Sequence, residues 1–156
     1  MMSTVIRSVA FIFWLCTICL ASHAAELDRL LSADQAPAGV VIEIVRGDTE
    51  GLRSALPQVR DISEQLRARF PGLPIVVVTH GAEQFGLLTA KQERLAPIHA
   101  EARALVDADI GLHVCGAHAG RYGHTPEDFP DYVDVSPSGP AQINDYIALG
   151  YTRLRL

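Results

Sequence analysis

The sequence has little positive charge, few charged residues overall and few cysteines, and these shortages exclude several classes of protein. Its 156 residues hold 13 Lys and Arg against 18 Asp and Glu, a formal net charge of −5. We therefore expect no nucleic-acid partner, because such partners require a basic surface. Only 20% of the residues are charged and 49% are apolar, which excludes a disordered chain. Length and composition indicate one globular domain with its own core.

The longest apolar run is too short for a membrane span. It covers positions 8–21, whereas a transmembrane helix needs about 20 apolar residues. Arg7 precedes the run, and Ser22 and Ala24 follow it as the small residues that a signal peptidase requires. We predict a signal peptide over residues 1–24, an N-terminal arm over 25–39 and an α/β domain over 40–156. The mature protein is then expected in the periplasm, with no membrane contact after cleavage.

Cysteine is scarce, and signal cleavage would make it scarcer. Of the three cysteines, Cys16 and Cys19 lie in the predicted signal peptide, which leaves Cys115 alone. Small exported proteins usually carry cysteines in pairs. An unpaired thiol in an oxidising compartment is expected to be buried, bonded to another chain, or used chemically.

Apolar patterns alternate between strand and helix along the rest of the chain. Continuous or alternating runs of β-branched and apolar residues predict strands at Val40–Val45, Ile75–His80, Ile110–Cys115, Asp131–Val135 and Tyr151–Leu156. Apolar residues at spacings of three and four predict helices at Leu52–Phe70, around Phe85–Leu88, at Ala96–Asp107 and at Pro140–Leu149. In the first of these helices, Ser54 is expected to cap the start and Pro57 to lie in the first turn. Strands separated by helices predict a small doubly wound, mainly parallel sheet of about five strands with helices on both faces.

Two of the predicted strands end in residues with reactive side chains. His80 and Gly81 follow the second strand, and His113, Cys115 and Gly116 close the third. Ligands bind beyond the carboxyl ends of the strands in sheets of this kind. Backbone N–H groups from Gly116 onward are expected to favour the thiolate of Cys115, which is its nucleophilic form.

Other side chains near this cysteine suggest support for it and two rival kinds of site. His80, His113, Gly116, His118 and Arg121 are candidates to support a thiolate or a bound anion. Histidine and cysteine also bind zinc and copper, but the order His-x-Cys-x-x-His is no established metal spacing. We therefore expect no metal and no cofactor.

The spacing of Cys115 and Arg121 supplies the second rival. An arginine six residues after a cysteine is similar to the anion-holding loop of cysteine-dependent phosphatases. The histidine that precedes the cysteine in that family is Val114 here, and the residue after the arginine is Tyr122 instead of Ser or Thr.

The order of elements and the residues at their ends resemble the DsrE/DsrF family of sulfur-relay proteins, in an exported branch. The likeness rests on strands ending in His80-Gly81 and Val114-Cys115-Gly116. It rests also on the segment Val133–Gly139 and on a last helix closing at Leu149-Gly150-Tyr151. The resemblance implies a parallel sheet between helices, a homo-oligomer (a trimer or hexamer), and a cysteine at the position of Cys115 that carries sulfur as a persulfide.

The resemblance leads to one preferred function and leaves alternatives open. The preferred function is sulfur transfer or sulfane-sulfur binding through Cys115, as a sulfurtransferase or sulfur carrier, with a sulfur donor and acceptor as partners. The first alternative is a non-catalytic oligomeric binding module in which Cys115 is merely buried, as free cysteines often are. The second is the cysteine phosphatase with Arg121 as its anion-binding residue.

Overall fold

The computed structural model describes residues 24–156, and the predicted signal peptide lies, apart from its last residue, outside them. The chain divides after Asp34 into two units. The described part of the first unit is a helix over 24–31 and a turn. No helix of the described residues is both long and apolar enough to cross a bilayer.

The second unit, Gln35–Leu156, is built on a parallel sheet. Its strands are β1 (Gly39–Ile44), β2 (Ile75–Thr79), β3 (Ile110–Cys115), β4 (Asp134–Ser136) and β5 (Tyr151–Arg155). They lie in the order β4-β3-β2-β1-β5, and all four neighbouring pairs are parallel. The predicted fold class is therefore confirmed.

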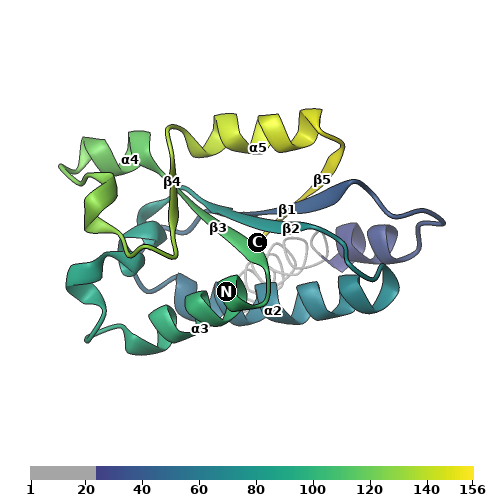
Figure 1. Cartoon of the computed structure of the whole chain (residues 1–156), viewed down its shortest axis with the longest axis horizontal. Helices are drawn as coiled ribbons and strands as arrows, with labels where there is room; N and C mark the ends of the chain where they lie inside the picture. The colour runs from purple at the N-terminus through teal and green to yellow at the C-terminus, as the bar shows by residue number, and fades with distance from the viewer. Residues whose placement is uncertain (1–23) are drawn as a thin grey trace, which may run out of the picture. The chain divides into compact units, whose positions relative to one another are not determined.

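Helices cover both faces of this sheet (Figure 1). The helices α2 (Leu52–Arg69) and α3 (Ala96–Asp107) lie side by side on one face, and α5 (Gly139–Ala148) crosses the other. Shorter helical segments fill two connections: the 3₁₀ turns η1 (Ala82–Leu87) and η2 (Thr89–Lys91) follow β2, and α4 (Gly116–Arg121) follows β3. A third 3₁₀ turn, η3 (Pro126–Asp128), precedes β4.

The first helix of the sheet domain starts at the predicted residue but lacks the predicted cap. α2 starts at Leu52 after Gly51, with no side-chain cap, so Ser54 lies inside the first turn and donates to the Gly51 carbonyl instead. Pro57 is therefore beyond the first turn, inside the helix. The apolar face formed by Leu52 and Leu56 is fully buried, and this burial offsets the hydrogen bond that proline cannot donate.

The sheet buries apolar side chains on both faces, as a parallel sheet with helices on each side requires. On the α5 face, Val41 and Val78 pack with Ile143. Because side chains alternate along a strand, Glu43 of β1, His80 just after β2, and His113 and Cys115 of β3 point to this same face. Polar side chains of three neighbouring strands thus lie on the face that α5 covers.

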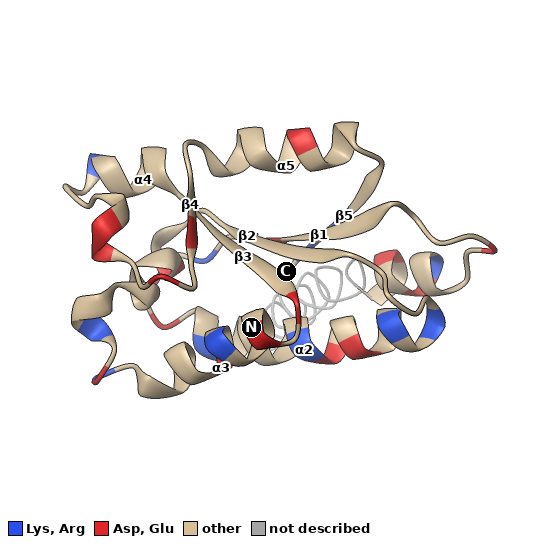
Figure 2. Ribbon diagram, viewed as in Figure 1, with Lys and Arg blue, Asp and Glu red and all other residues tan. Residues whose placement is uncertain are grey.

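The surface carries charges of both signs. Arg, Asp and Glu all occur along α2, and residues of both signs occur elsewhere on the described chain (Figure 2). The full sequence has a formal net charge of −5.

Candidate functional site

The carboxyl ends of β2 and β3 bring His80 and Cys115 to the same edge of the sheet. The two strands are neighbours, with Thr79 paired to Val114. His80 comes directly after Thr79 and Cys115 directly after Val114, so the two residues lie next to each other across the strand pair. The sequence left open whether His80 approaches Cys115, because that depends on strand order, and the observed order brings them together.

The backbone of Cys115 is fixed by a buried glutamine. The Cys115 N–H donates to Gln84 Oε1 at 2.8 Å, and Gln84 Nε2 donates to the Cys115 carbonyl at 3.3 Å. Gln84 comes from η1 and is fully buried. The side chain of Cys115 caps α4 by accepting a hydrogen bond from the His118 N–H, with 3.4 Å between nitrogen and Sγ. An N–H aimed at sulfur is a contact that stabilises negative charge there.

A small pocket opens above the sulfur. Its volume is about 240 Å³, and it is lined by His80, Cys115, Ala117, His118, Arg121, Ser138 and Pro140. Cys115 is only 5% exposed, so it forms part of the pocket floor and offers little of itself to bulk solvent. The pocket is large enough for a few atoms beyond the sulfur.

The N-terminus of α5 forms one wall of this pocket and packs tightly against its floor. A Cβ added at Gly139 would lie 2.7 Å from His80 Cβ and 3.2 Å from Cys115 Cβ. Only glycine allows this approach, because real Cβ atoms do not come so close to other carbons. Ser138 caps the helix by accepting from the Ala141 N–H.

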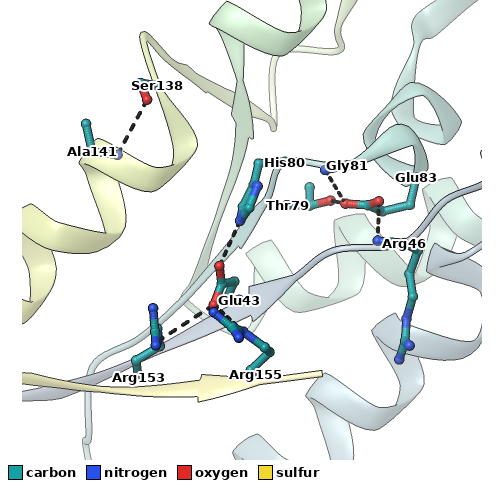
Figure 3. A network of polar contacts seen from close by, with 10 residues as sticks. All are labelled: Glu43, Arg46, Thr79, His80, Gly81, Glu83, Ser138, Ala141, Arg153 and Arg155. Carbon is teal, nitrogen blue, oxygen red and sulfur yellow. Dashed lines mark hydrogen bonds and ion pairs between the residues drawn. The ribbon is translucent and has the colours of Figure 1, made fainter.

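A fully buried carboxylate shapes the loop that follows His80. Glu83 accepts hydrogen bonds from the Arg46 N–H at 2.6 Å, from the Gly81 N–H at 2.9 Å and from the Thr79 hydroxyl (Figure 3). Three donors compensate the burial of this side chain. Because two of them lie next to His80 in the chain, the bonds fix the backbone on either side of it.

His80 itself is held by a second buried carboxylate, Glu43 of β1 (Figure 3). His80 Nε2 lies 2.9 Å from Glu43 Oε1. The other oxygen, Oε2, accepts from Arg155 Nε at 2.8 Å and lies 3.7 Å from Arg153 Nε. Burial raises the pKa of Glu43, but the hydrogen bonds from His80 and Arg155 and the charges of Arg155 and Arg153 lower it more, so the pKa lies below its ordinary value.

His113 lies on the same face but belongs to a different group of contacts. Its Nε2 is 3.0 Å from the Tyr146 hydroxyl of α5, and its Nδ1 is 3.5 Å from Ser136 Oγ. Burial lowers the pKa of His113, while the charge of Asp134 opposes that shift. The ring therefore links β3 to α5 and does not line the pocket, contrary to the predicted role beside the thiol.

His118 lines the pocket and also stacks on Phe85, with ring centroids 5.4 Å apart. Tyr122 and His124 lie at 5.1 and 5.3 Å from the same ring. The buried Nε2 of His118 has no hydrogen-bond partner. A Cβ at Gly116 would lie 3.0 Å from the Ser136 carbonyl oxygen, so the absence of a side chain there lets the end of β4 approach.

The structure does not favour the phosphatase interpretation. The six residues from Gly116 to Arg121 form α4, whereas an anion-holding loop must curl its N–H groups around a phosphate. Arg121 still lines the pocket.

Among residues 24–156, no three His, Cys, Asp or Glu side chains gather in an arrangement that would hold a metal ion.

Several residues of the site were missed in the sequence. Gln84 and Glu83 follow the second strand as two adjacent polar residues, with no local pattern that marks them as buried. Glu43 did carry a signal, since it is the single charged residue in the apolar run Val40–Val45. A lone charge in a strand buried on both faces requires a partner, although the sequence does not say which one.

Comparison with known proteins agrees with this architecture. A family model described as "DsrE/DsrF-like family" matches residues 62–156, which is more than half of the chain. A solved structure of a protein of unknown function from Methanobacterium thermoautotrophicum is 21% identical. It covers 75% of this chain and 97% of its own, with a TM-score of 0.60, and at that identity it shows the fold alone. No curated protein matches the chain.

Proposed function

The chain belongs to the DsrE/DsrF-like family, whose members act in sulfur relay, and from that premise we propose that it carries sulfane sulfur as a persulfide on Cys115. The observation that carries the proposal is the position of the sulfur. Cys115 forms the floor of a pocket with two histidines and an arginine in its walls. The family supplies the sulfur chemistry, and the pocket supplies a place for it.

The step is a thiol exchange in which atoms and electrons balance. The Cys115 thiolate attacks the outer sulfur of a donor persulfide, R–S–SH, and forms a new S–S bond while the donor's S–S bond breaks. The Cys115 sulfur is oxidised and the donor leaves as a reduced thiol, R–SH. Transfer to an acceptor thiolate reverses these roles, so no cofactor is required.

Three features support Cys115 as the carrier. The His118 N–H donates to its sulfur, Gln84 fixes its backbone, and the pocket volume of about 240 Å³ leaves space for one more sulfur and part of a donor.

We further propose that the protein works in the periplasm as a homo-oligomer. The leader at residues 1–24 supports export, and the family resemblance supports assembly.

Intact mass spectrometry of the purified chain tests the carrier role. The protein is incubated with polysulfide, with thiosulfate or with neither, and each sample is measured before and after reductant. We expect a gain of one sulfur atom that reductant removes and that Cys115→Ser abolishes. In a preparation that keeps residues 1–24, Cys115→Ser retains Cys16 and Cys19 and shows whether another thiol takes the sulfur. Absence of an adduct on Cys115 would refute the proposal.

A second candidate follows from the low exposure of the thiol. At 5% exposure, Cys115 also fits a binding module whose cysteine is only a small core residue. A thiol reagent such as iodoacetamide separates the two functions. Labelling of Cys115 only in denaturant indicates the module, and labelling of the folded protein at neutral pH indicates the carrier.

A further inference from the structure

We propose that His80 donates a proton to the thiolate that leaves when sulfur is transferred to Cys115, and that Glu43 is the residue that positions His80. This inference rests on the proposed function, since it assigns roles within the same site. It goes beyond the family match, because that match begins at residue 62, and Glu43 lies before it.

The first support is the place of His80. Its side chain is 17% exposed, and His80 and Cys115 line the same pocket. Gly139 Cα faces both of their Cβ atoms, so the two side chains start from neighbouring points. Among the described residues His80 makes no hydrogen bond to the sulfur, and a donor bound in the pocket would lie against both side chains.

The second support is the way Glu43 fixes the imidazole ring. The depressed pKa of Glu43 keeps its side chain a carboxylate at neutral pH. A carboxylate only accepts hydrogen bonds, so His80 Nε2 carries the hydrogen and donates it to Glu43 Oε1 over 2.9 Å. The remaining ring nitrogen, Nδ1, has no hydrogen-bond partner among residues 24–156. A carboxylate that holds one nitrogen of a histidine sets the tautomer and orientation of the ring, and leaves the other nitrogen for chemistry.

The third support is that Glu43 is itself held from the opposite side. Arg155 and Arg153 both come from β5 and approach Oε2, whereas His80 approaches Oε1 (Figure 3). The carboxylate is 7% exposed at its side chain and has little freedom to turn away. Two positive groups compensate its burial, so the negative charge is retained next to the histidine.

These contacts define a balanced step. The Cys115 thiolate attacks the outer sulfur of R–S–SH, the new S–S bond forms, the old one breaks, and the leaving thiolate R–S⁻ takes a proton from Nδ1 of the His80 imidazolium. A disulfide R–S–S–R′ reacts with Cys115 by the same exchange, with R′–S⁻ as the leaving thiolate. The positive charge of the imidazolium is next to Glu43 before transfer, and the ring regains its proton from water afterwards. Protonation matters most when the leaving thiol is weakly acidic, because a basic thiolate leaves slowly by itself.

A purely structural role for the network makes a different prediction. The Arg155–Glu43 contact joins edge strand β5 to β1, so loss of Glu43 could weaken the sheet and slow every reaction of Cys115 alike. The proton-donor role instead slows reactions with poor leaving groups selectively. The ratio of two rates measured on one sample separates these roles, because a loss of folded protein cancels in the ratio.

The experiment measures the reaction of the purified full chain with two disulfides. The aromatic disulfide 5,5′-dithiobis(2-nitrobenzoate) releases an acidic thiol, whereas the alkyl disulfide bis(2-hydroxyethyl) disulfide releases a weakly acidic one. Modification of Cys115 is followed by the mass of the peptide that contains it. We expect His80→Gln to slow the alkyl reaction about 100-fold, the lower end of typical acid–base contributions, and the aromatic reaction only about threefold. We expect Glu43→Gln to change the ratio in the same direction by about tenfold.

His124→Gln is the matched control. His124 also pairs with a carboxylate, Asp128 at 3.5 Å, but it does not line the pocket, and we expect its ratio to equal that of the wild type. Equal slowing of both disulfides by His80→Gln, or no slowing, would overturn the inference. This result is separate from the sulfur-loading test. A chain that forms no persulfide can still show the dependence on the leaving group, and a chain that forms the persulfide can lack that dependence.

Discussion

At the scale of single residues, the site depends on polar side chains buried beside the reactive thiol. Gln84 is the clearest case, because its amide meets both the N–H and the carbonyl of Cys115. A side chain that satisfies two backbone groups at once fixes the position of the sulfur. The burial of Gln84 makes these bonds costly to lose.

Gln84→Leu tests this role. Leucine fills a similar volume but leaves two backbone groups of Cys115 unpaired, so we expect the free energy of unfolding to fall by about 2–4 kcal/mol, at about 1–2 kcal/mol for each group. Urea denaturation measures the change. The exposed Gln92 provides the control, and Gln92→Leu is expected to change stability by less than about 0.5 kcal/mol. A Gln84→Leu protein as stable as the wild type would contradict the assigned role.

The depressed pKa of Glu43 predicts how stability depends on pH. The folded protein holds this carboxylate in its charged form more strongly than the unfolded chain does. Its contribution is therefore complete above the ordinary pKa of glutamate and is lost as the pH falls through the lower pKa of the folded state. We therefore expect the free energy of unfolding of Glu43→Gln to fall less than that of the wild type as the pH is lowered.

Urea denaturation at a series of pH values from neutral to acid measures the effect of Glu43. The exposed Glu64 on α2 offers the comparison, and Glu64→Gln is expected to follow the wild-type profile. Parallel curves for Glu43→Gln and the wild type would show that the buried carboxylate contributes nothing to acid sensitivity.

From the sequence, only the site residues at the ends of strands could be predicted. Cys115 and His80 could be predicted, because each ends an apolar run and parallel strands place such ends together. The partners of these residues could not, because Gln84 meets Cys115 across 31 positions and Glu43 meets His80 across 37. Such pairs leave no local periodicity. His113 shares the face of Cys115 as alternation predicts, yet Tyr146 of α5 binds it away from the pocket.

At the scale of elements, the strands and long helices follow their apolar patterns closely, and the errors fall at their ends. The fourth strand was predicted at Asp131–Val135 and is Asp134–Ser136, because it pairs only along the last three positions of β3. The cap predicted for α2 at Ser54 was wrong, since no side chain caps the helix. Tertiary pairing and burial decide these boundaries, and neither is local.

Two glycines test how closely the elements around the site pack. Gly139 at the start of α5 has no room for a methyl group beside His80, whereas Gly120 in α4 has open space around it. We expect Gly139→Ala to lower the free energy of unfolding by about 1–3 kcal/mol through overpacking. Gly120→Ala is expected to raise it by about 0.5–1 kcal/mol through helix propensity.

The same pair of variants reports on the pocket. Because α5 forms the wall above Cys115, Gly139→Ala should also change the rate at which iodoacetamide labels the thiol, while Gly120→Ala should not. Chemical denaturation and labelling followed by mass spectrometry give both results. Equal stability of the two alanine variants would show that the approach of α5 to His80 is looser than described.

At the scale of the whole molecule, the fold was the most predictable property. Alternating strands and helices and continuous apolar strands already indicate a doubly wound sheet, which the structure confirms. The signal peptide predicted at residues 1–24 lies, apart from residue 24, outside the described residues, and both the signal peptide and export remain predictions. N-terminal sequencing of the protein recovered from the periplasm of a bacterial host is expected to begin at Ala25, whereas an intact Met1 would contradict cleavage.

The central claim is that Cys115 takes up sulfane sulfur and gives it back. Cyanide tests this most directly, because it removes the outer sulfur of a persulfide as thiocyanate and returns the thiol. The chain is loaded with polysulfide, freed of excess donor and treated with cyanide. We expect thiocyanate in a one-to-one ratio to Cys115, and none above background from Cys115→Ser. Equal yields from the two proteins, or none from either, would contradict the account.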